Sequence, residues 1–331
     1  MKRLIVCSDG LWSAPATAGD SNIALLAAAV APVARDGAGQ VVITDPYQGL
    51  PVAADHLDSR WLEFSVCSLY RGLALNYSPG DQLWLFGFSR GSYVVRSCIG
   101  MLRNVGLLKK AHLDRVADAW RIYRTRWGAD ARNGVSFRTA FSHRVGVKFL
   151  GVWDTLGPAG IPLASDTERS DLPGFHDTQL SSLVENACHA LAIDERQRGH
   201  AACLWRTPAD RTRTEQCWFA GNHRDIGGIQ GDRGLANISL RWMLARAAAL
   251  GLELDHDFLA AAMAQRGGAS GDDYRNAKVG RAGTRLRPVG LTNSDETLHS
   301  SAEQRYLRNS RYRPVNLKAY MDRDEQIQLP W

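Results

Sequence analysis

The 331-residue chain has few cysteines and no close pair of them. Its six cysteines, of which no two form a C-x-x-C pair, are Cys7, Cys67, Cys98, Cys188, Cys203 and Cys217. Three of them, Cys7, Cys98 and Cys217, stand within apolar runs. The pattern predicts buried free thiols of a reducing compartment and excludes a cysteine-ligated metal centre.

Long hydrophobic runs are also missing. The N-terminus, MKRLIVCSDG, has two basic residues followed by only four apolar ones, which is too short for the core of a signal peptide. The stretch Ile23–Ala34 contains Pro32 and is too short to span a bilayer. We therefore expect cytoplasmic synthesis, and a secretion route that needs no signal peptide stays open.

Charge of one sign is not concentrated anywhere. The chain has 40 Lys and Arg against 34 Asp and Glu, a net charge of +6, and its Arg residues are scattered. Without a basic block, a nucleic-acid partner is disfavoured. A mild attraction to anionic surfaces such as phospholipid headgroups remains.

Apolar runs typical of strands alternate with helical patterns up to about residue 251. The predicted strands are Leu4–Cys7, Val41–Thr44, Leu83–Phe88, Val145–Trp153 and Gln216–Ala220, with Ala201–Trp205 as a weaker candidate. The predicted helices are Asn22–Ala34, Arg60–Leu75, Ser92–Leu102, Leu180–Ile193 and Ile238–Leu250. This alternation predicts an α/β fold with a mostly parallel central sheet and helices on both faces.

Other stretches fit the alternation poorly. Residues 106–144 and 160–178 are expected to rise over the carboxyl edge of the sheet as a small helical cap. The tail from Gly267 is rich in Gly, Arg, Asp and Asn and has little periodicity. We expect a catalytic domain over residues 1–251 and a C-terminal extension over 252–331 that packs on it or trails from it.

The run Gly87-Phe88-Ser89-Arg90-Gly91 fits the G-x-S-x-G pattern between a predicted strand and a predicted helix. A strand that turns sharply into a helix presents its serine at the tip of a nucleophile elbow. Gly87 and Gly91 would be needed because a side chain there would clash across the strained turn. An incidental serine in an ordinary strand–helix turn is the alternative.

A nucleophilic serine needs a base, and the base needs an acid that fixes its tautomer. Asp154 directly follows the predicted strand Val145–Trp153, where such an acid belongs, although a capping Asp is the alternative. His223 follows a later strand and precedes a loop of small residues, which is the usual place of the base. Four nearby histidines lack that context: His143, His176, His189 and His200.

Acyl transfer also needs two N–H donors for the developing oxyanion. The amide of Arg90, at the start of a helix, is one candidate. The Gly10-Leu11 loop after the first strand is the natural source of the second, and Asp9 would orient that loop.

Asp225, two residues from His223, is a rival acid, but we prefer it as a residue that locks the turn by bonding backbone N–H groups. A metal site made of Asp9, His223 and Asp225 is a further alternative, because oxygen and imidazole ligands suit divalent ions. It would leave Ser89 unexplained.

At this point the motifs resemble a known family, the catalytic domain of the type VI secretion phospholipase effectors, which also contains uncharacterised bacterial homologues. The ordered blocks that carry the resemblance, over about residues 3–251, are Cys7-Ser8-Asp9-Gly10, Asp45-Pro46, GFSRGSYVVR, FLGVWDTLG, FHDTQLSSLVENACHALAIDE and WFAGNHRDIGG with ISLRWM.

The resemblance implies an α/β-hydrolase fold, a triad of Ser89, Asp154 and His223, and hydrolysis of glycerophospholipid acyl esters. It also implies an antibacterial effector, delivered by a secretion machine and neutralised at home by an immunity protein. The chain departs from the family pattern at Leu11, Asn222 and Arg224, which bears on substrate preference.

We therefore expect a serine hydrolase of the phospholipase or lipase type that needs no metal or organic cofactor. Two alternatives remain: a soluble carboxylesterase that acts on small acyl esters, and a non-catalytic interaction module that keeps the hydrolase fold.

Overall fold

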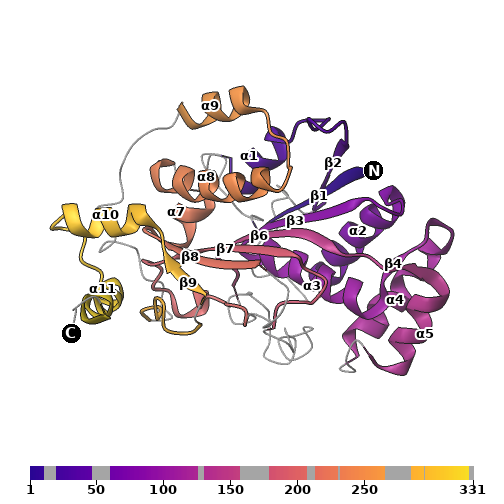
Figure 1. Ribbon diagram of the computed structural model, residues 1–331. Coiled ribbons are helices and arrows are strands. Elements are labelled where there is room, and N and C mark those ends of the chain that lie inside the picture. Colours follow the sequence, from indigo (N-terminus) through magenta and orange to yellow (C-terminus); the bar gives the residue numbers. More distant parts are fainter. Residues whose placement is uncertain are drawn as a thin grey trace.

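The computed structural model describes residues 1–10, 20–46, 60–125, 130–156, 179–206, 213–229, 232–264, 285–293 and 295–327. Within them a seven-stranded sheet runs through the centre of the molecule, with strand order β2-β1-β3-β6-β7-β8-β9 (Figure 1). Every neighbouring pair is parallel. The strands are β1 (Lys2–Asp9), β2 (Gly39–Thr44), β3 (Gln82–Phe88), β6 (Val147–Trp153), β7 (Asn186–Ala192), β8 (Arg213–Phe219) and β9 (Glu296–Leu298).

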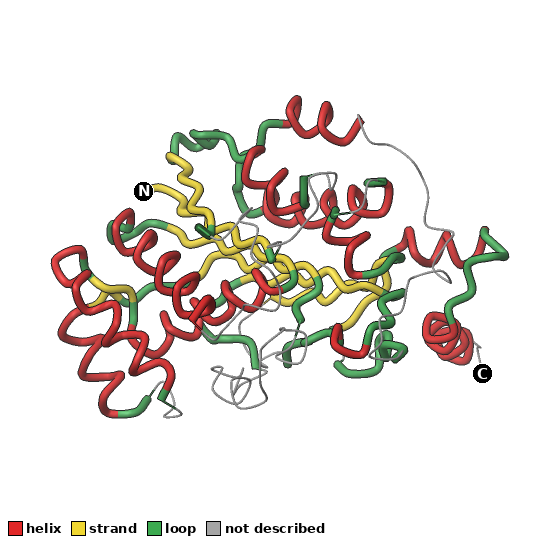
Figure 2. Tube along the Cα trace, turned by 180° about the vertical axis from the view of Figure 1, so that it is seen from behind, coloured by secondary structure: helices red, strands yellow, loops and turns green. Residues whose placement is uncertain are grey.

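Helices cover both faces of this sheet, as Figure 2 shows. One face carries α2 (Arg60–Asn76) and α3 (Arg90–Val105), and the other carries α1 (Asn22–Ala29) and α8 (Gly234–Ala249). The strands between them are buried on both sides, which requires apolar residues at successive positions. In β1, Leu4 and Val6 join the first layer, while Ile5 and Cys7 join the second. The α/β fold expected from the alternation, with a mostly parallel central sheet and helices on both faces, is confirmed.

The segment 106–144 was expected to cap the carboxyl edge, and the described part of it lies elsewhere. It folds as β4 (Leu107–Leu108), a 3₁₀ turn η2 (Lys110–Arg115), α4 (Val116–Arg124), α5 (Arg132–Phe141) and β5 (Ser142–His143). The chain enters it from the C-terminal end of α3, which runs back along the sheet from the carboxyl edge. The Arg138 side chain donates to the carbonyls of Arg103 and Asn104 at that end. The described part of this insertion therefore packs beside α2 and α3, toward the amino edge of the sheet. The second expected cap segment, 160–178, lies outside the described residues.

One predicted helix is wrong. The stripe within Leu180–Ile193 favoured a helix, but residues 186–192 form strand β7 in the middle of the sheet. A strand buried on both faces is apolar at nearly every position, so any helical period can be found in it. The weaker strand candidate, Ala201–Trp205, contains only an isolated bridge at Ala202.

The C-terminal part of the chain is integrated into this domain. Strand β9 extends the sheet beyond β8, and α9 (His256–Ala264), α10 (Ser300–Arg308) and α11 (Val315–Ile327) follow α8 in sequence. A third apolar cluster joins Tyr312 and Leu317 to Trp218 of β8. The described part of the C-terminal extension therefore packs on the catalytic domain and adds a strand to its sheet.

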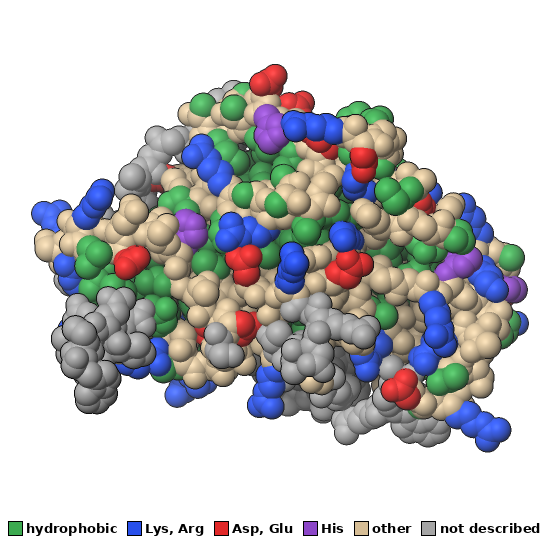
Figure 3. Space-filling model, viewed as in Figure 1, with side chains coloured by type: hydrophobic (Ala, Val, Ile, Leu, Met, Phe, Trp, Pro, Cys, Tyr) green, Lys and Arg blue, Asp and Glu red, His purple; other side chains and the backbone are tan. Residues whose placement is uncertain are grey.

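The expectations drawn from missing features concern the cysteines, hydrophobic runs and charge. All six cysteines are free thiols, and four of them are buried. Among the described helices, none has the length and apolarity needed to cross a bilayer. On the face in Figure 3, the Lys and Arg side chains are spread out, with Asp and Glu between them.

The packing of the C-terminal part gives a direct test. Leu317→Ala should lower the free energy of unfolding by about 2–5 kcal/mol, because this side chain is fully buried. The matched control is Leu307→Ala on α10, where the side chain is 62% exposed and little change is expected. Urea unfolding measures both values. Equal stabilities for the two variants would contradict the packing of α11 on the sheet.

Candidate functional site

Ser89 lies between β3 and α3 at the carboxyl edge of the sheet. Its backbone has φ 59° and ψ −119°, and the helix begins at the next residue. Ser89 and Asp154 are the two non-glycine residues with positive φ among those described. Such backbones cost about 1–3 kcal/mol each and persist where the surrounding structure fixes them. The strained turn expected from the G-x-S-x-G motif is present.

The glycines of the motif are required by close backbone approach. A Cβ at Gly91 would lie 2.0 Å from the carbonyl oxygen of Ser8 in β1. A Cβ at Gly87 would lie 2.6 Å from the Cα of Ser92. The supporting role predicted for Gly87 and Gly91 therefore has a steric cause, which is contact between β1, β3 and the first turn of α3.

His223 opens the short helix α7 (His223–Gly227), directly after β8. The Asn222 side chain accepts hydrogen bonds from the amides of Arg224 and Asp225, and the Asp225 carboxylate accepts one from the Asn222 amide. This capping box fixes the first turn of the helix. Asp225 thus locks the turn, as preferred from the sequence. The Phe88 ring stacks on the His223 imidazole, with 4.7 Å between the two ring centroids.

Asp154 directly follows strand β6, and the structure brings it together with Ser89 and His223. His223 Nε2 lies 2.9 Å from Ser89 Oγ, and His223 Nδ1 lies 2.6 Å from Asp154 Oδ2. A carboxylate only accepts hydrogen bonds, so Nδ1 carries the proton and Nε2 is left to accept from the serine hydroxyl. All three residues are buried.

Burial and charge set the protonation states of this group. Burial lowers the pKa of His223, partly opposed by its bond to Asp154, which favours the neutral imidazole that this geometry needs. Burial alone would raise the pKa of Asp154, but the charge of Arg287 and the bond from His223 outweigh it and hold that pKa well below its usual range. At neutral pH the site therefore contains an ionised Asp154 and a neutral His223.

One of the expected oxyanion donors, the Gly10 amide, forms a hydrogen bond within the protein. The Gly10 amide donates to the Phe88 carbonyl at 3.1 Å, so it is not available, and Leu11 lies outside the described residues. Gly10 matters for a different reason: a Cβ there would lie 2.7 Å from the Arg90 amide nitrogen. The missing side chain keeps space over the first amide of α3. Arg90 itself begins that helix, and burial lowers the pKa of its guanidinium to about 10.

The metal-site alternative finds no support in the geometry. Both ring nitrogens of His223 are engaged by Ser89 and Asp154. Asp9 accepts a short hydrogen bond from the Ser21 hydroxyl, which caps α1. In the described part of the chain, no group of three or more His, Cys, Asp or Glu side chains is placed to hold an ion. Asp9 thus connects β1 to the N-terminus of α1. Its expected role was to orient the loop after β1, and Leu11 of that loop lies outside the described residues.

Sequence reasoning missed a second set of residues behind Asp154. Arg287, from the C-terminal extension, forms a buried bidentate ion pair with Asp154. Glu195 accepts from the backbone amide of His223 at 3.2 Å, and Asp194 accepts from the amide of Gly221 at 2.7 Å. The two acids follow the end of β7 by one residue. An Asp-Glu pair after a recognised strand would have indicated that these side chains lie at the carboxyl edge of the sheet, close to His223. Because the segment Leu180–Ile193 was predicted as a helix, the two acids were not recognised as residues that follow a strand. Arg287 stands in an Arg-rich run, and nothing in the sequence separates it from its neighbours.

Two histidines in this region are structural neighbours of the site. His189 of β7 is fully buried and accepts from the Thr155 amide through Nε2 at 3.1 Å. The His200 ring lies 5.1 Å from the His223 ring, and its Nδ1 is 3.7 Å from a Glu195 carboxylate oxygen. Neither of them contacts Ser89 through a hydrogen bond found in the structure. His143 lies in β5 on the distant insertion, and His176 is outside the described residues.

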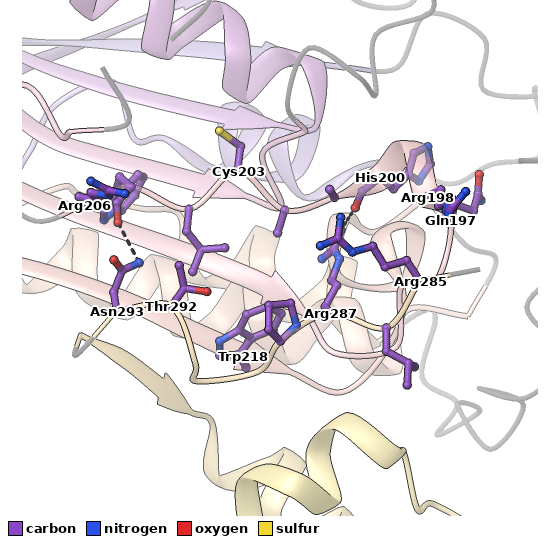
Figure 4. A pocket seen from close by; sticks show the side chains of 16 residues that line it. Gln197, Arg198, His200, Cys203, Arg206, Trp218, Arg285, Arg287, Thr292 and Asn293 are labelled. Carbon is purple, nitrogen blue, oxygen red and sulfur yellow. Dashed lines mark hydrogen bonds between the residues drawn. The ribbon is translucent and has the colours of Figure 1, made fainter. Parts of the chain in front are cut away.

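A cavity of about 350 Å³ adjoins this region on the side of β8 (Figure 4). Its walls come from the segments 197–206 and 285–293, with Trp218 of β8 between them. Arg287 and His200 form part of the wall, joined by a hydrogen bond from the guanidinium to the His200 carbonyl. Arg287 therefore contacts Asp154 and also lines the cavity.

The parallel sheet, the strained serine at its carboxyl edge and the serine–histidine–aspartate contact define the class of α/β-hydrolase-like proteins. Residues 2–246 match the family model described as type VI secretion system (T6SS), phospholipase effector Tle1-like, catalytic domain. The chain belongs to this family of hydrolase domains. The resemblance expected from the sequence motifs is confirmed, and Arg287 lies beyond the matched residues.

Three comparisons with individual proteins add detail. The uncharacterized protein YEL023C of Saccharomyces cerevisiae is 35% identical over 158 residues, which are 44% of this chain and 22% of the yeast protein. An uncharacterized protein from Pseudomonas aeruginosa is similar in structure, with 15% identity, a TM-score of 0.48 and coverage of 84% of this chain and 51% of the other. The Tle1 effector bound to the VgrG spike of the type 6 secretion system gives 15% identity, a TM-score of 0.37 and coverage of 68% and 50%. The chain spans about half or less of the length of these proteins.

The buried His189 predicts a pH dependence of stability. Burial, with the charge of Arg96 adding to it, lowers the pKa of His189 to about 3, against about 6.5 in an unfolded chain. As the pH falls below about 6.5, the unfolded state binds a proton that the folded state does not, so stability is lost. His189→Gln keeps an acceptor for the Thr155 amide and removes the titration. Between pH 6 and pH 4.5, the free energy of unfolding should fall with pH in both proteins. The slope for His189→Gln should be smaller than the wild-type slope by about 1.4 kcal/mol per pH unit.

Urea unfolding across this pH range measures the two slopes. His256→Gln, at an exposed position on α9, is the control and should keep the wild-type slope. Equal slopes for His189→Gln and the wild type would contradict the burial of a neutral imidazole.

Proposed function

We propose that this chain is a serine hydrolase that cleaves acyl ester bonds of glycerophospholipids through a Ser89–His223–Asp154 triad. The observation that carries the proposal is the continuous chain of hydrogen bonds from Ser89 Oγ through both nitrogens of His223 to Asp154, at a strained strand–helix turn. A structural serine needs neither the strained backbone nor a histidine held in one tautomer by a buried carboxylate.

The proposed reaction begins with acylation. Ser89 Oγ attacks the ester carbonyl carbon, and His223 Nε2 takes the hydroxyl proton as the new C–O bond forms. Asp154 keeps the imidazole in place and stabilises the imidazolium. The Arg90 amide, at the N-terminus of α3, donates to the developing oxyanion. The tetrahedral intermediate then expels the alcohol, which receives the proton from His223.

Deacylation uses the same groups. Water attacks the acyl-enzyme carbonyl, His223 takes the water proton, and Ser89 leaves with that proton as the free fatty acid forms. The steps balance with substrate and water alone, so the scheme contains no metal or organic cofactor. The second N–H donor to the oxyanion is proposed to be the backbone amide of Leu11, in the segment that follows β1 in the sequence.

The lipid class rests on family membership, together with the net positive charge of +6 that favours anionic membrane surfaces. The same membership supports a delivered antibacterial effector that is made in the cytoplasm and is paired with secretion machinery and an immunity protein.

The first test of this function is hydrolysis by the purified chain of long-chain phosphatidylglycerol in mixed micelles and of a short p-nitrophenyl ester. Wild type should cleave the micellar lipid, and Ser89→Ala should lose activity by on the order of 10⁴-fold or more. Ser78→Ala, at an exposed position, is the control and should keep full activity.

Each outcome decides between the hypotheses. Cleavage of the short ester alone, without gain from micelles, would replace the phospholipase by a soluble carboxylesterase. Equal turnover of either substrate by wild type and Ser89→Ala would remove Ser89 from the mechanism. Absence of any hydrolysis would favour the non-catalytic interaction module.

Gly10→Ala tests the space proposed for the oxyanion. The added methyl group would lie 2.7 Å from the Arg90 amide nitrogen, so the oxyanion could no longer approach it. The kcat for the p-nitrophenyl ester should fall by about 10²–10³-fold, as for loss of one oxyanion donor. Gly39→Ala, where the nearest atom to the added Cβ is 4.0 Å away, is the matched control. Wild-type kcat in Gly10→Ala would place the oxyanion elsewhere.

A further inference from the structure

Arg287 is the one cationic side chain that contacts Asp154 in the described structure, and it comes from the part of the chain beyond the family match. Its Nη1 lies 2.5 Å from Asp154 Oδ1, and its Nη2 lies 2.9 Å from Oδ2. The two groups are almost completely buried, with side-chain exposures of 5% and 0%. A parallel two-bond pair of this kind fixes the plane of the carboxylate as well as its charge.

The guanidinium is itself held in place from outside the triad. It donates to the carbonyl of Ala192 at the end of β7 and to the carbonyl of His200. The Asn316 side chain on α11 donates to the Arg287 carbonyl and to the Ile193 carbonyl. The position of Asp154 therefore depends on β7 and on the C-terminal helix, which are far apart in the sequence.

The charge of Arg287 also acts on His223. Without a nearby cation, a buried Asp154 carboxylate would favour a protonated imidazole next to it and make the pair a poor acceptor of the Ser89 proton at neutral pH. A cation bound to the same carboxylate lowers the affinity of the Asp154–His223 pair for a proton. Arg287 is among the causes that lower the pKa of His223 and of Asp154.

We propose that Arg287 is a positioning residue of the catalytic site: it orients the Asp154 carboxylate and keeps His223 unprotonated at neutral pH. This inference rests on the proposed hydrolase function. It makes the C-terminal extension a functional component of the site, because residues 2–246 alone do not contain this side chain.

Two substitutions separate orientation from charge. Arg287→Gln removes the charge and one arm of the fork, so kcat/KM for the p-nitrophenyl ester should fall by on the order of 10²-fold, and the acid limb of its pH profile should move to higher pH. Arg287→Lys keeps the charge and loses the planar fork, so its acid limb should stay at the wild-type pH while kcat falls. Arg308→Gln, at an exposed position on α10, is the control and should match the wild type in both respects.

The pH profile distinguishes this role from a structural one. A residue that only supports the fold would lower the amount of active protein and leave the acid limb where it was. An unchanged acid limb in a folded Arg287→Gln would therefore overturn the proposal, and so would a wild-type kcat in Arg287→Lys. If Arg287→Gln does not fold, the kcat of Arg287→Lys decides the matter.

A measurement without turnover keeps this inference distinct from the proposed function. Nuclear magnetic resonance titration of the His223 imidazole in a Ser89→Ala background should show a higher midpoint with Gln at position 287 than with Arg. This holds even if the chain hydrolyses none of the esters, in which case the proposed function fails. Identical midpoints would overturn the role of Arg287 whether or not the esters are cleaved.

Discussion

The buried carboxylate of Asp154 is the constraint on which the rest of the site depends. An ion removed from water costs several kcal/mol unless opposite charge and hydrogen bonds replace the lost solvent. Here the replacements come from three directions: the His223 imidazole, the Arg287 guanidinium and the Ala192 amide. Each belongs to a different part of the chain, so satisfying one carboxylate draws β6, β7, α7 and the C-terminal extension together at the carboxyl edge of the sheet.

The same arrangement explains why backbone strain is found there. Ser89 and Asp154 both adopt positive φ, one at the end of β3 and the other at the end of β6, which is its neighbour in the sheet. Glycines remove the steric conflict around Ser89, and the Ser89 amide donates to the Trp153 carbonyl, which links the two turns. The local cost is offset by these contacts, and the result is a hydroxyl group presented to an imidazole of fixed tautomer.

Family membership and tertiary structure divide the chain differently. The family match ends near the C-terminus of α8, which is close to the end of the regular alternation of strands and helices. The packed unit continues through β9 and α11, because the outer face of β8 would otherwise be exposed. A domain defined by sequence similarity can thus be smaller than the unit that completes its site.

The sequence by itself determined five of the seven strands of the sheet, the four helices α1, α2, α3 and α8 that cover it, and the three residues of the hydrogen-bonded chain. Buried strands, helix stripes and G-x-S-x-G are local signals, and the positions of Asp154 and His223 follow from the rule that parallel strands end at one edge. Tertiary structure alone decided the rest. Strand β7 was predicted as a helix because burial on both faces removes the alternation that marks a strand. The Gly10 amide donates to the carbonyl of Phe88 in the neighbouring strand β3. Only its distance to Asp154 distinguishes Arg287 from several similar arginines. Contacts between residues more than a hundred positions apart leave no pattern within a local window of sequence, since what fixes them is the burial of a charge that the fold brings into reach.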